Sequence, residues 1–318
     1  MPNPIHASAN PSMRPSPDSG AYALLFINGV LIALMLALAK LVTGNGVSVI
    51  AYAFWQTLGA GCLLACFVGR EMRQFVRPAL LRYALIAGAT GMAIPNAWAF
   101  YISGKIGSGF TSTLYALPPL FTLVLSCLLK LEKWNGKRLA GIVIAGAGCI
   151  WIVLAQNSHA PSGVIAWYAA GCLIPLSLSF GNVYRTIAWP TNLSPMALAT
   201  GMMLASASIL AIVSVLRDDY LLRGLDRPEN SLLVGGQMVL TAITYVGFFA
   251  LQKRASPVFL SQMGSVAALA GLTIGLFFFS ESYSQGVWLG VLCVIAGLLV
   301  TNLSFRGIPF MTGKPRVL

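Results

Sequence analysis

The sequence predicts an all-α integral membrane protein of ten transmembrane helices, built as a 5+5 inverted repeat. Hydrophobic residues make up 57% of the 318-residue chain, charged residues make up 9%, and the mean hydropathy is +0.80. Such a composition cannot cover a water-exposed surface, and the length accommodates about ten spans of roughly 20 residues. A pattern of residues that recurs at a constant offset of 149 positions indicates the duplication.

Each expected span is an apolar run bounded by charged or polar residues. The first half contributes 22–42, 48–68, 82–102, 109–129 and 138–155, and the second half contributes 163–184, 195–216, 231–251, 257–279 and 286–305. Together they form one domain at 22–305, with repeat one at 22–155 and repeat two at 163–305. Residues 1–21 are polar and proline-rich, which predicts a disordered cytoplasmic tail, and 306–318 form a second cytoplasmic tail.

The duplication is carried by two glutamates and the glycines that follow them. Glu132 precedes Gly141 and Gly148 at the close of one apolar run, and Glu281 precedes Gly290 and Gly297 at the close of another. Duplicated halves are typical of membrane transporters, in which two repeats move about a shared site. The glycines, seven residues apart in each copy, are expected to let helices pack closely. The same register also pairs Phe100 with Phe249, Lys105 with Arg254, Phe110 with Phe259, Ser112 with Ser261, Leu120 with Leu269 and Leu123 with Leu272.

Lysine and arginine are distributed unevenly between the loops of the two sides. With the amino terminus inside, fifteen basic residues fall on the inner side and five on the outer side. Because positive charge marks the cytoplasmic side, both termini are expected there. An odd number of spans, five, separates Glu132 from Glu281, so the second copy is expected to lie upside down relative to the first. The bias also accounts for the net charge of +12, so no nucleic-acid partner is needed.

These features resemble the drug/metabolite transporter superfamily, in its EamA-like branch. The resemblance is carried by LPPLFTLVLSCLLKLE with a G-x6-G helix after it, and by their second appearance as LTIGLFFFSE and GVWLGVLCVIAG. It covers roughly residues 22–305, implies export or exchange of a small metabolite, and leaves the cargo open. The chain departs from the family in two places. Ala268 stands where a proline would answer Pro119, and helix 2 has Phe54, Trp55 and Gln56 where many members carry an Arg that would suit an anionic substrate.

The eight carboxylates and two histidines all lie outside the expected spans. Since proton relays use buried Asp, Glu or His, we expect a facilitator or an exchanger driven by the solute's own gradient, with a proton-coupled multidrug-type efflux transporter as the alternative. Lys40 and Arg185 end helices 1 and 6. One interpretation makes them anchors that snorkel to opposite interfaces, and the other makes them gates or substrate-carboxylate contacts at the two mouths of one pathway.

Polar and aromatic side chains in otherwise apolar spans are candidates for the wall of that pathway. An amide that faced lipid would leave its polar atoms unpaired, so the asparagines are expected to face the bundle interior. Hydrogen bonding between helices and placement in an interfacial aromatic belt are the alternative roles. Pro118 and Pro119 remove two backbone donors in mid-span and predict a kink. The substrate-binding candidates are Asn28, Asn96, Trp98, Tyr101, Tyr115, Asn182, Tyr184, Tyr245, Gln262 and Ser265.

Other function classes lack the residues that they need. The six cysteines are expected to be ordinary buried residues, with no histidine to complete a metal site, so neither a metal nor a cofactor is predicted. An enzyme would need a nucleophile or paired acids, and a receptor would need larger loops. The predicted function is export or exchange of a small neutral or zwitterionic metabolite, such as an amino acid, by alternating access in a bacterial inner membrane. The expected partners are this solute and the lipid bilayer, and the chain is expected to be a monomer or a homodimer.

Overall fold

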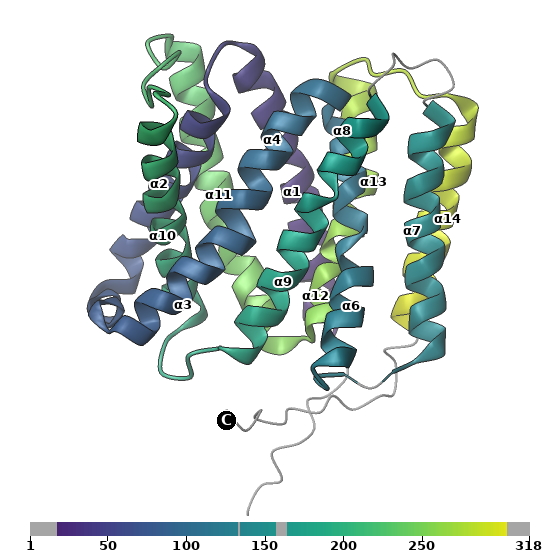
Figure 1. The fold of residues 1–318 in the computed structure, drawn as a ribbon, viewed down its shortest axis with the longest axis horizontal. Coiled ribbons are helices and arrows are strands. Elements are labelled where there is room, and N and C mark those ends of the chain that lie inside the picture. Colours follow the sequence, from purple (N-terminus) through teal and green to yellow (C-terminus); the bar gives the residue numbers. More distant parts are fainter. Residues whose placement is uncertain (1–17, 133, 157–163, 304–318) are drawn as a thin grey trace, which may run out of the picture.

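The structure, a computed structural model, describes residues 18–132, 134–156 and 164–303. Within these ranges the regular elements are helical, and no strand occurs. Figure 1 shows the helices side by side, running between two ends of the molecule. In chain order the elements are α1 (Ser19–Gly44), α2 (Val49–Val68), the 3-10 helix η1 (Gly69–Val76), α3 (Pro78–Gly88), the π-helical turn η2 (Ala89–Ala93), α4 (Ile94–Ile106), α5 (Ser108–Thr113), the 3-10 turn η3 (Leu114–Ala116), α6 (Pro118–Leu128), α7 (Gly136–Gln156), α8 (Val164–Gly171), α9 (Leu173–Ile187), α10 (Pro195–Leu216), α11 (Pro228–Arg254), α12 (Pro257–Ser261), α13 (Met263–Phe278) and α14 (Gln285–Leu303).

Short polar residues and prolines set the starts of the helices. The Asp18 carboxylate accepts a hydrogen bond from the Ala21 amide at 2.8 Å, and the Ser194 hydroxyl accepts one from the Ala197 amide at 3.1 Å. Both satisfy first-turn donors that the helix cannot use itself. Proline occupies the first position of α10, α11 and α12, where its missing N–H costs nothing. The predicted tails lie almost wholly outside the described residues, and α1 begins at Ser19, inside the predicted 1–21 tail.

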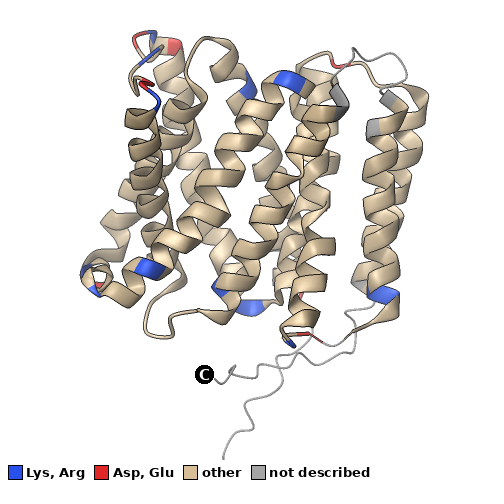
Figure 2. Ribbon diagram, in the orientation of Figure 1, with Lys and Arg blue, Asp and Glu red and all other residues tan. Residues whose placement is uncertain are grey.

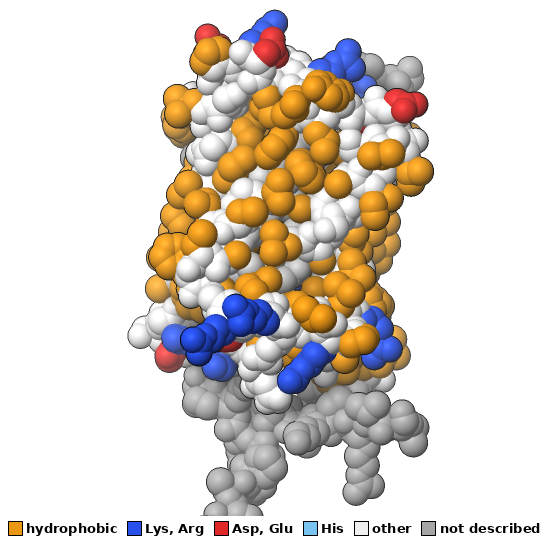
Figure 3. Space-filling model, turned by 90° about the vertical axis from the view of Figure 1, so that its left-hand side faces the viewer, with side chains coloured by type: hydrophobic (Ala, Val, Ile, Leu, Met, Phe, Trp, Pro, Cys, Tyr) orange, Lys and Arg blue, Asp and Glu red, His pale blue; other side chains and the backbone are white. Residues whose placement is uncertain are grey.

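The described helices form a multi-pass membrane bundle. Seven of them are long and apolar enough to cross a bilayer, and a shorter apolar helix covers Gln285–Thr301. The sequence predicts ten spans, so this criterion confirms membrane spanning but not the full count. Figure 2 shows the charged residues gathered at the two ends of the bundle, and in Figure 3 an apolar surface lies between these ends. Cys62 and Cys66 are exposed on the outer face of α2, so the prediction that all the cysteines are buried was wrong for this pair.

The predicted kink in the fourth span is present as a break in the helix. The α-helical geometry of α5 ends at Thr113, a 3-10 turn follows, and α6 begins again at Pro118. Proline lacks the amide that would continue the ladder of hydrogen bonds, which explains the interruption. The Ser179 hydroxyl from α9 donates to the Pro118 carbonyl at 3.0 Å. The second half has an analogous break without proline, between α12 and α13 at Gln262.

Helices α7 and α14 pack against each other through the glycines that the repeat contains. A Cβ atom placed on Gly148 would lie 2.7 Å from the Gly290 carbonyl oxygen, and one placed on Gly290 would lie 2.7 Å from the Gly148 carbonyl oxygen. Gly141 and Gly297 oppose each other in the same way farther along the pair. Only residues without side chains permit this approach of two backbones, which confirms the predicted role of the glycines. Figure 1 shows the pair at one side of the bundle.

Candidate functional site

A cavity of ≈ 50 Å³ lies in the middle of the bundle and is enclosed by segments from both halves of the chain. Its wall includes α1, η2, α4 and η3 from the first half and α9, α11, α12 and α13 from the second. Most of the lining is apolar, and a few polar groups converge on it, which is the usual character of a small-molecule site. Four of the predicted substrate-binding residues line this cavity: Asn96, Tyr115, Asn182 and Tyr245.

Irregular backbone places two of these side chains. Asn96 follows Pro95 directly after the π-helical turn η2, and Tyr115 lies in the 3-10 turn that precedes Pro118. Breaks of this kind are tolerated at membrane depth where they border a cavity or another helix. Asn96 is 6% exposed, and its side-chain amide contacts the Tyr245 hydroxyl, which takes at most one of the two N–H donors on Nδ2. The cavity wall therefore offers an unused amide donor.

Arg185 lies directly behind this wall and is buried. Its side chain comes from the last turn of α9 and is 1% exposed. The guanidinium donates to the Asn182 Oδ1 atom at 2.6 Å and to the Gln252 Oε1 atom at 3.0 Å, and its Cζ atom lies 5.1 Å from the centre of the Phe248 ring. An interfacial anchor would expose its charged end, so the anchor interpretation is wrong for Arg185.

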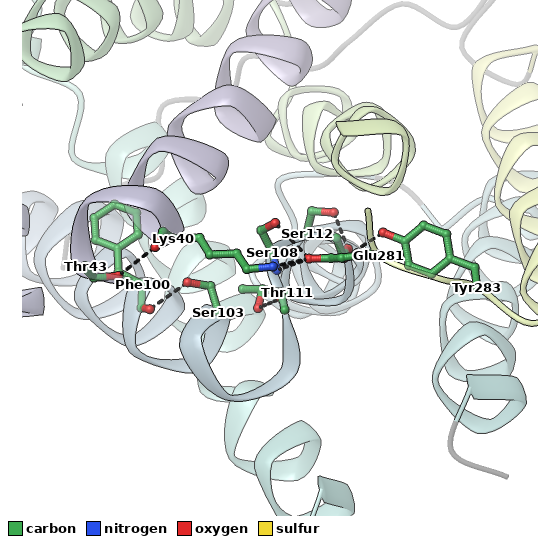
Figure 4. Close-up of polar contacts among 11 residues, drawn as sticks. Lys40, Thr43, Phe100, Ser103, Ser108, Thr111, Ser112, Glu281 and Tyr283 are labelled. Atoms are coloured by element: carbon green, nitrogen blue, oxygen red, sulfur yellow. Dashed lines mark hydrogen bonds and ion pairs between the residues drawn. The ribbon is translucent and has the colours of Figure 1, made fainter. Parts of the chain in front are cut away.

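At one end of the bundle Glu281 joins the two halves of the chain (Figure 4). The Lys40 ammonium of α1 donates to its Oε1 atom at 2.6 Å, the Ser108 amide at the start of α5 donates to the same atom at 3.2 Å, and the Tyr283 hydroxyl donates to Oε2 at 2.8 Å. Burial acts to raise the pKa of Glu281, but the hydrogen bonds from Lys40 and Tyr283 outweigh it and hold the pKa below its ordinary value. Lys40 is therefore an ion-pair partner inside the fold.

Near the α12 start, Glu132 makes an analogous set of contacts. Its carboxylate pairs with the Arg138 guanidinium and accepts a hydrogen bond from the Val258 amide in the first turn of α12, at 3.4 Å. Burial raises the pKa of Glu132 against the opposing charge of Arg138. Each glutamate of the duplicated motif thus caps a helix start in the other half of the chain.

Comparisons with known proteins show what this chain is similar to. Residues 19–154 match the model of the EamA-like transporter family. Protein PecM of Dickeya dadantii (strain 3937) is similar, with 22% identity over 226 residues, which is 68% of this chain and 72% of that protein. The first half of the chain therefore resembles the EamA-like transporter family. Both matches support the resemblance to the drug/metabolite transporter superfamily that the sequence predicts. A solved crystal structure shares its fold, with a TM-score of 0.68 and 17% identity over 92% of this chain and 100% of that one.

Two of the predicted substrate-binding residues line a different pocket. Trp98 and Tyr101 stack on each other, with ring centres 5.6 Å apart, at the wall of a pocket of ≈ 570 Å³ between α2, α4, α8 and α10. The Trp98 indole donates to the Ala170 carbonyl at 2.8 Å. This pocket is larger than the central cavity and is also lined by both halves of the chain, but the buried amides and phenols of Asn96, Tyr115, Asn182 and Tyr245 converge on the central one. We therefore take the central cavity as the candidate site.

The other predicted residues do not line either pocket. Asn28 is buried and donates to the Leu24 carbonyl at 2.8 Å, while Tyr184 stacks against Tyr83 with ring centres 5.9 Å apart. Gln262 and Ser265 are buried at the α12–α13 break, and no partner for either Gln262 amide atom occurs in the described part of the chain. As predicted, all three asparagines, Asn28, Asn96 and Asn182, face the interior.

Sequence reasoning missed a buried amide pair and the partners of the charged groups. The Gln237 Nε2 atom of α11 donates to the Gln56 Oε1 atom of α2 at 2.7 Å, and both side chains are fully buried. The criterion that selected the asparagines, an amide in an apolar span, would also have selected these glutamines. No local signal pairs Arg185 with Gln252, because 67 residues separate them in the chain.

Proposed function

We propose that this chain is an EamA-like transporter and that it moves a small neutral or zwitterionic organic solute across a bacterial inner membrane by alternating access. The observation that carries the proposal is the central cavity, which both halves of the chain line and which has amide and phenol groups in an apolar wall. A site between two repeats can be exposed to either side by rocking one repeat against the other.

The contacts between the halves support an inverted repeat of ten spans. Several spans consist of consecutive helical segments that follow one another along one line, which we call a rod: α3–η2–α4, α5–η3–α6, α8–α9 and α12–α13. When each of these is counted once, the described part of the chain has ten rods in the predicted order. The α5 start at Ser108 and the α12 start at Pro257 are 149 residues apart, and each is capped by the glutamate of the other half. In α7 and α14, Gly148 contacts Gly290 and Gly141 contacts Gly297, while the 149-residue register relates Gly141 to Gly290 and Gly148 to Gly297. An axis in the membrane plane would exchange these pairs.

The orientation proposed for the chain has both termini in the cytoplasm. Helix α1 begins and α14 ends at the lower end of the bundle in Figure 1. The excess of lysine and arginine falls on this side when the ten rods are taken as spans. A facilitator or exchanger remains the proposed mode of coupling. A proton-coupled efflux transporter is the second candidate, favoured by the buried Glu132, whose pKa burial raises.

Metabolite profiling tests the proposed function. Medium from cells that overexpress or lack the protein is compared, and the solute found is then followed in proteoliposomes. Asn96→Ala, which alters the central cavity, is expected to lower transport at least tenfold at equal expression. Trp98→Phe, two residues away on the same helix but in the other pocket, is the matched control and is expected to retain most of the activity. The reverse order of the two variants would place the pathway in the second pocket and refute the assignment of the site.

A further inference from the structure

Arg185 is a buried cation without a counter-ion. Among the described residues, ion pairs within 4.0 Å join Lys40 to Glu281 and Arg138 to Glu132, and none includes Arg185. Its two amide acceptors, on Asn182 and Gln252, carry only partial charges, so they solvate the guanidinium without neutralising it. An isolated buried charge costs more free energy than a buried charge that is paired. The fold therefore maintains a positive charge beside the cavity that another group is needed to balance.

The groups around Arg185 have donors to spare. A guanidinium carries five N–H donors, and three have partners among the described residues, one of them the weak acceptor Sδ of Met202 at 3.9 Å. Asn96 on the cavity wall also has a spare N–H donor, because its Nδ2 atom carries two and Tyr245 takes at most one. Spare donors without acceptors match a ligand group that only accepts hydrogen bonds and carries negative charge.

The Arg185 guanidinium lies close to the cavity. Three residues that contact it, Gly91, Asn182 and Phe248, also line the cavity. A Cβ atom on Gly91 would overlap the guanidinium, and one on Gly181 would lie 3.1 Å from it, so glycine at these positions makes room for the cation. The cavity has a volume of ≈ 50 Å³ and one planar guanidinium beside it. These features suit one carboxylate better than a phosphate, because a phosphate is larger and carries more charge.

We propose that the transported solute carries a carboxylate and that this group docks in the central cavity between Arg185 and Asn96. The inference rests on the proposed transport function and narrows the neutral or zwitterionic solute to a zwitterion with a carboxylate. It assigns Arg185 as the specificity-determining residue of the site. An uncharged solute of the same shape leaves the guanidinium unbalanced and binds weakly.

Binding of small probes to the purified protein tests the site without knowledge of the solute. Propionate and propionamide have nearly the same shape and differ in charge, and methanesulfonate at equal ionic strength controls for anions in general. Propionate is expected to raise the apparent melting temperature with increasing concentration, and propionamide is expected to have no effect. Arg185→Gln is expected to weaken the propionate response at least tenfold, and Arg185→Lys to retain part of it. Equal responses to propionate and propionamide, or a wild-type propionate response in Arg185→Gln, would overturn the proposal.

An internal counter-ion provides a second test that does not remove the arginine. Asn182→Asp places a carboxylate at the atom that already accepts from the guanidinium at 2.6 Å. This variant is expected to melt at a higher temperature than the wild type and to lose the propionate response. Asn28→Asp is the matched control, because Asn28 is equally buried but has no contact with Arg185, and it is expected to melt at a lower temperature. A propionate response that survives in Asn182→Asp would contradict the inference.

The outcomes separate this inference from the proposed function. If propionate binding depends on Arg185 but profiling finds no transported solute, the carboxylate site stands and the transport proposal fails. If profiling finds a solute without a carboxylate that Arg185→Gln carries at the wild-type rate, transport stands and the carboxylate inference fails.

Discussion

The contact between α7 and α14 makes a sharp prediction, because the same substitution two residues apart should change stability in opposite directions. In Gly148→Ala the new Cβ atom would lie 2.7 Å from the Gly290 carbonyl oxygen, 2.8 Å from the Cys293 Cβ atom and 2.9 Å from the Val294 amide nitrogen. Backbone atoms cannot rotate away, so the two helices must separate. In Gly146→Ala the nearest atom is Leu117 Cδ2 at 3.9 Å, which is an ordinary contact.

The magnitudes follow from two opposing effects. Replacing glycine with alanine inside a helix stabilises it by about 0.5–1 kcal/mol. Overpacking costs about 1–3 kcal/mol. In Gly146→Ala only the gain in helix propensity applies, so this variant is expected to be stabilised by about 0.5–1 kcal/mol. In Gly148→Ala the overpacking cost exceeds the gain in helix propensity, so this variant is expected to be destabilised by about 1–2 kcal/mol. This corresponds to a fall of roughly 2–6 °C in melting temperature.

Thermal unfolding of the purified proteins in one detergent at one scan rate measures both variants. A fixed rate is needed because the unfolding of membrane proteins of this size is seldom reversible. Gly297→Ala, on the opposing helix, is expected to behave like Gly148→Ala. The reasoning is refuted if Gly148→Ala melts at or above the wild-type temperature, since the two backbones would then not be in the close contact described.

Three further predictions concern charge. Arg138→Met leaves the buried Glu132 without its guanidinium and is expected to lower stability by about 3–5 kcal/mol, while adding Glu132→Gln recovers part of the loss in the same melting assay. Because the pKa of Glu281 is lowered in the fold, its ionised form stabilises the protein above the unfolded pKa of about 4.3, and this stabilisation is lost as pH falls through the lower folded value. Glu281→Gln is therefore expected to melt below the wild type at pH 7 and to converge with it as the pH falls below the folded pKa of Glu281; a constant gap would contradict the role of the charge. Because all acids and histidines lie outside the predicted spans, transport in proteoliposomes is expected to persist without a pH gradient and to respond to a counter-gradient of the solute. Loss of accumulation with a protonophore, without exchange, would favour the proton-coupled alternative.

The order of the helices and their approximate limits could be read from the sequence. The predicted span 195–216 coincides with α10, and the predicted 22–42 lies within α1, because hydropathy depends on residues that are neighbours in the chain. The break at Pro118 was predictable for the same reason, since proline acts on its own turn. The glycine contact of α7 and α14 was predictable as close packing, but the identity of the partner helix was not.

The sequence could not show which candidate residues line the same pocket, because this depends on how the neighbouring helices pack. Asn96 and Trp98 are two residues apart on α4, so a helical turn of about 100° per residue points them in different directions. The sequence grouped them because both are unusual in an apolar span. Only the packing of α8 and α10 against α4 shows that Trp98 faces a different pocket from Asn96.

The sequence alone determined that the chain is embedded in a membrane, which segments are apolar enough to be helices there, and that a motif is duplicated. Tertiary structure alone decided which charges are buried and what faces them. Lys40 and Glu281 are 241 residues apart, and the groups that hold Arg185 come from α9 and α11. Composition and periodicity report on neighbours in the chain, whereas the energy of a buried charge depends on whichever distant groups the fold brings within hydrogen-bonding distance.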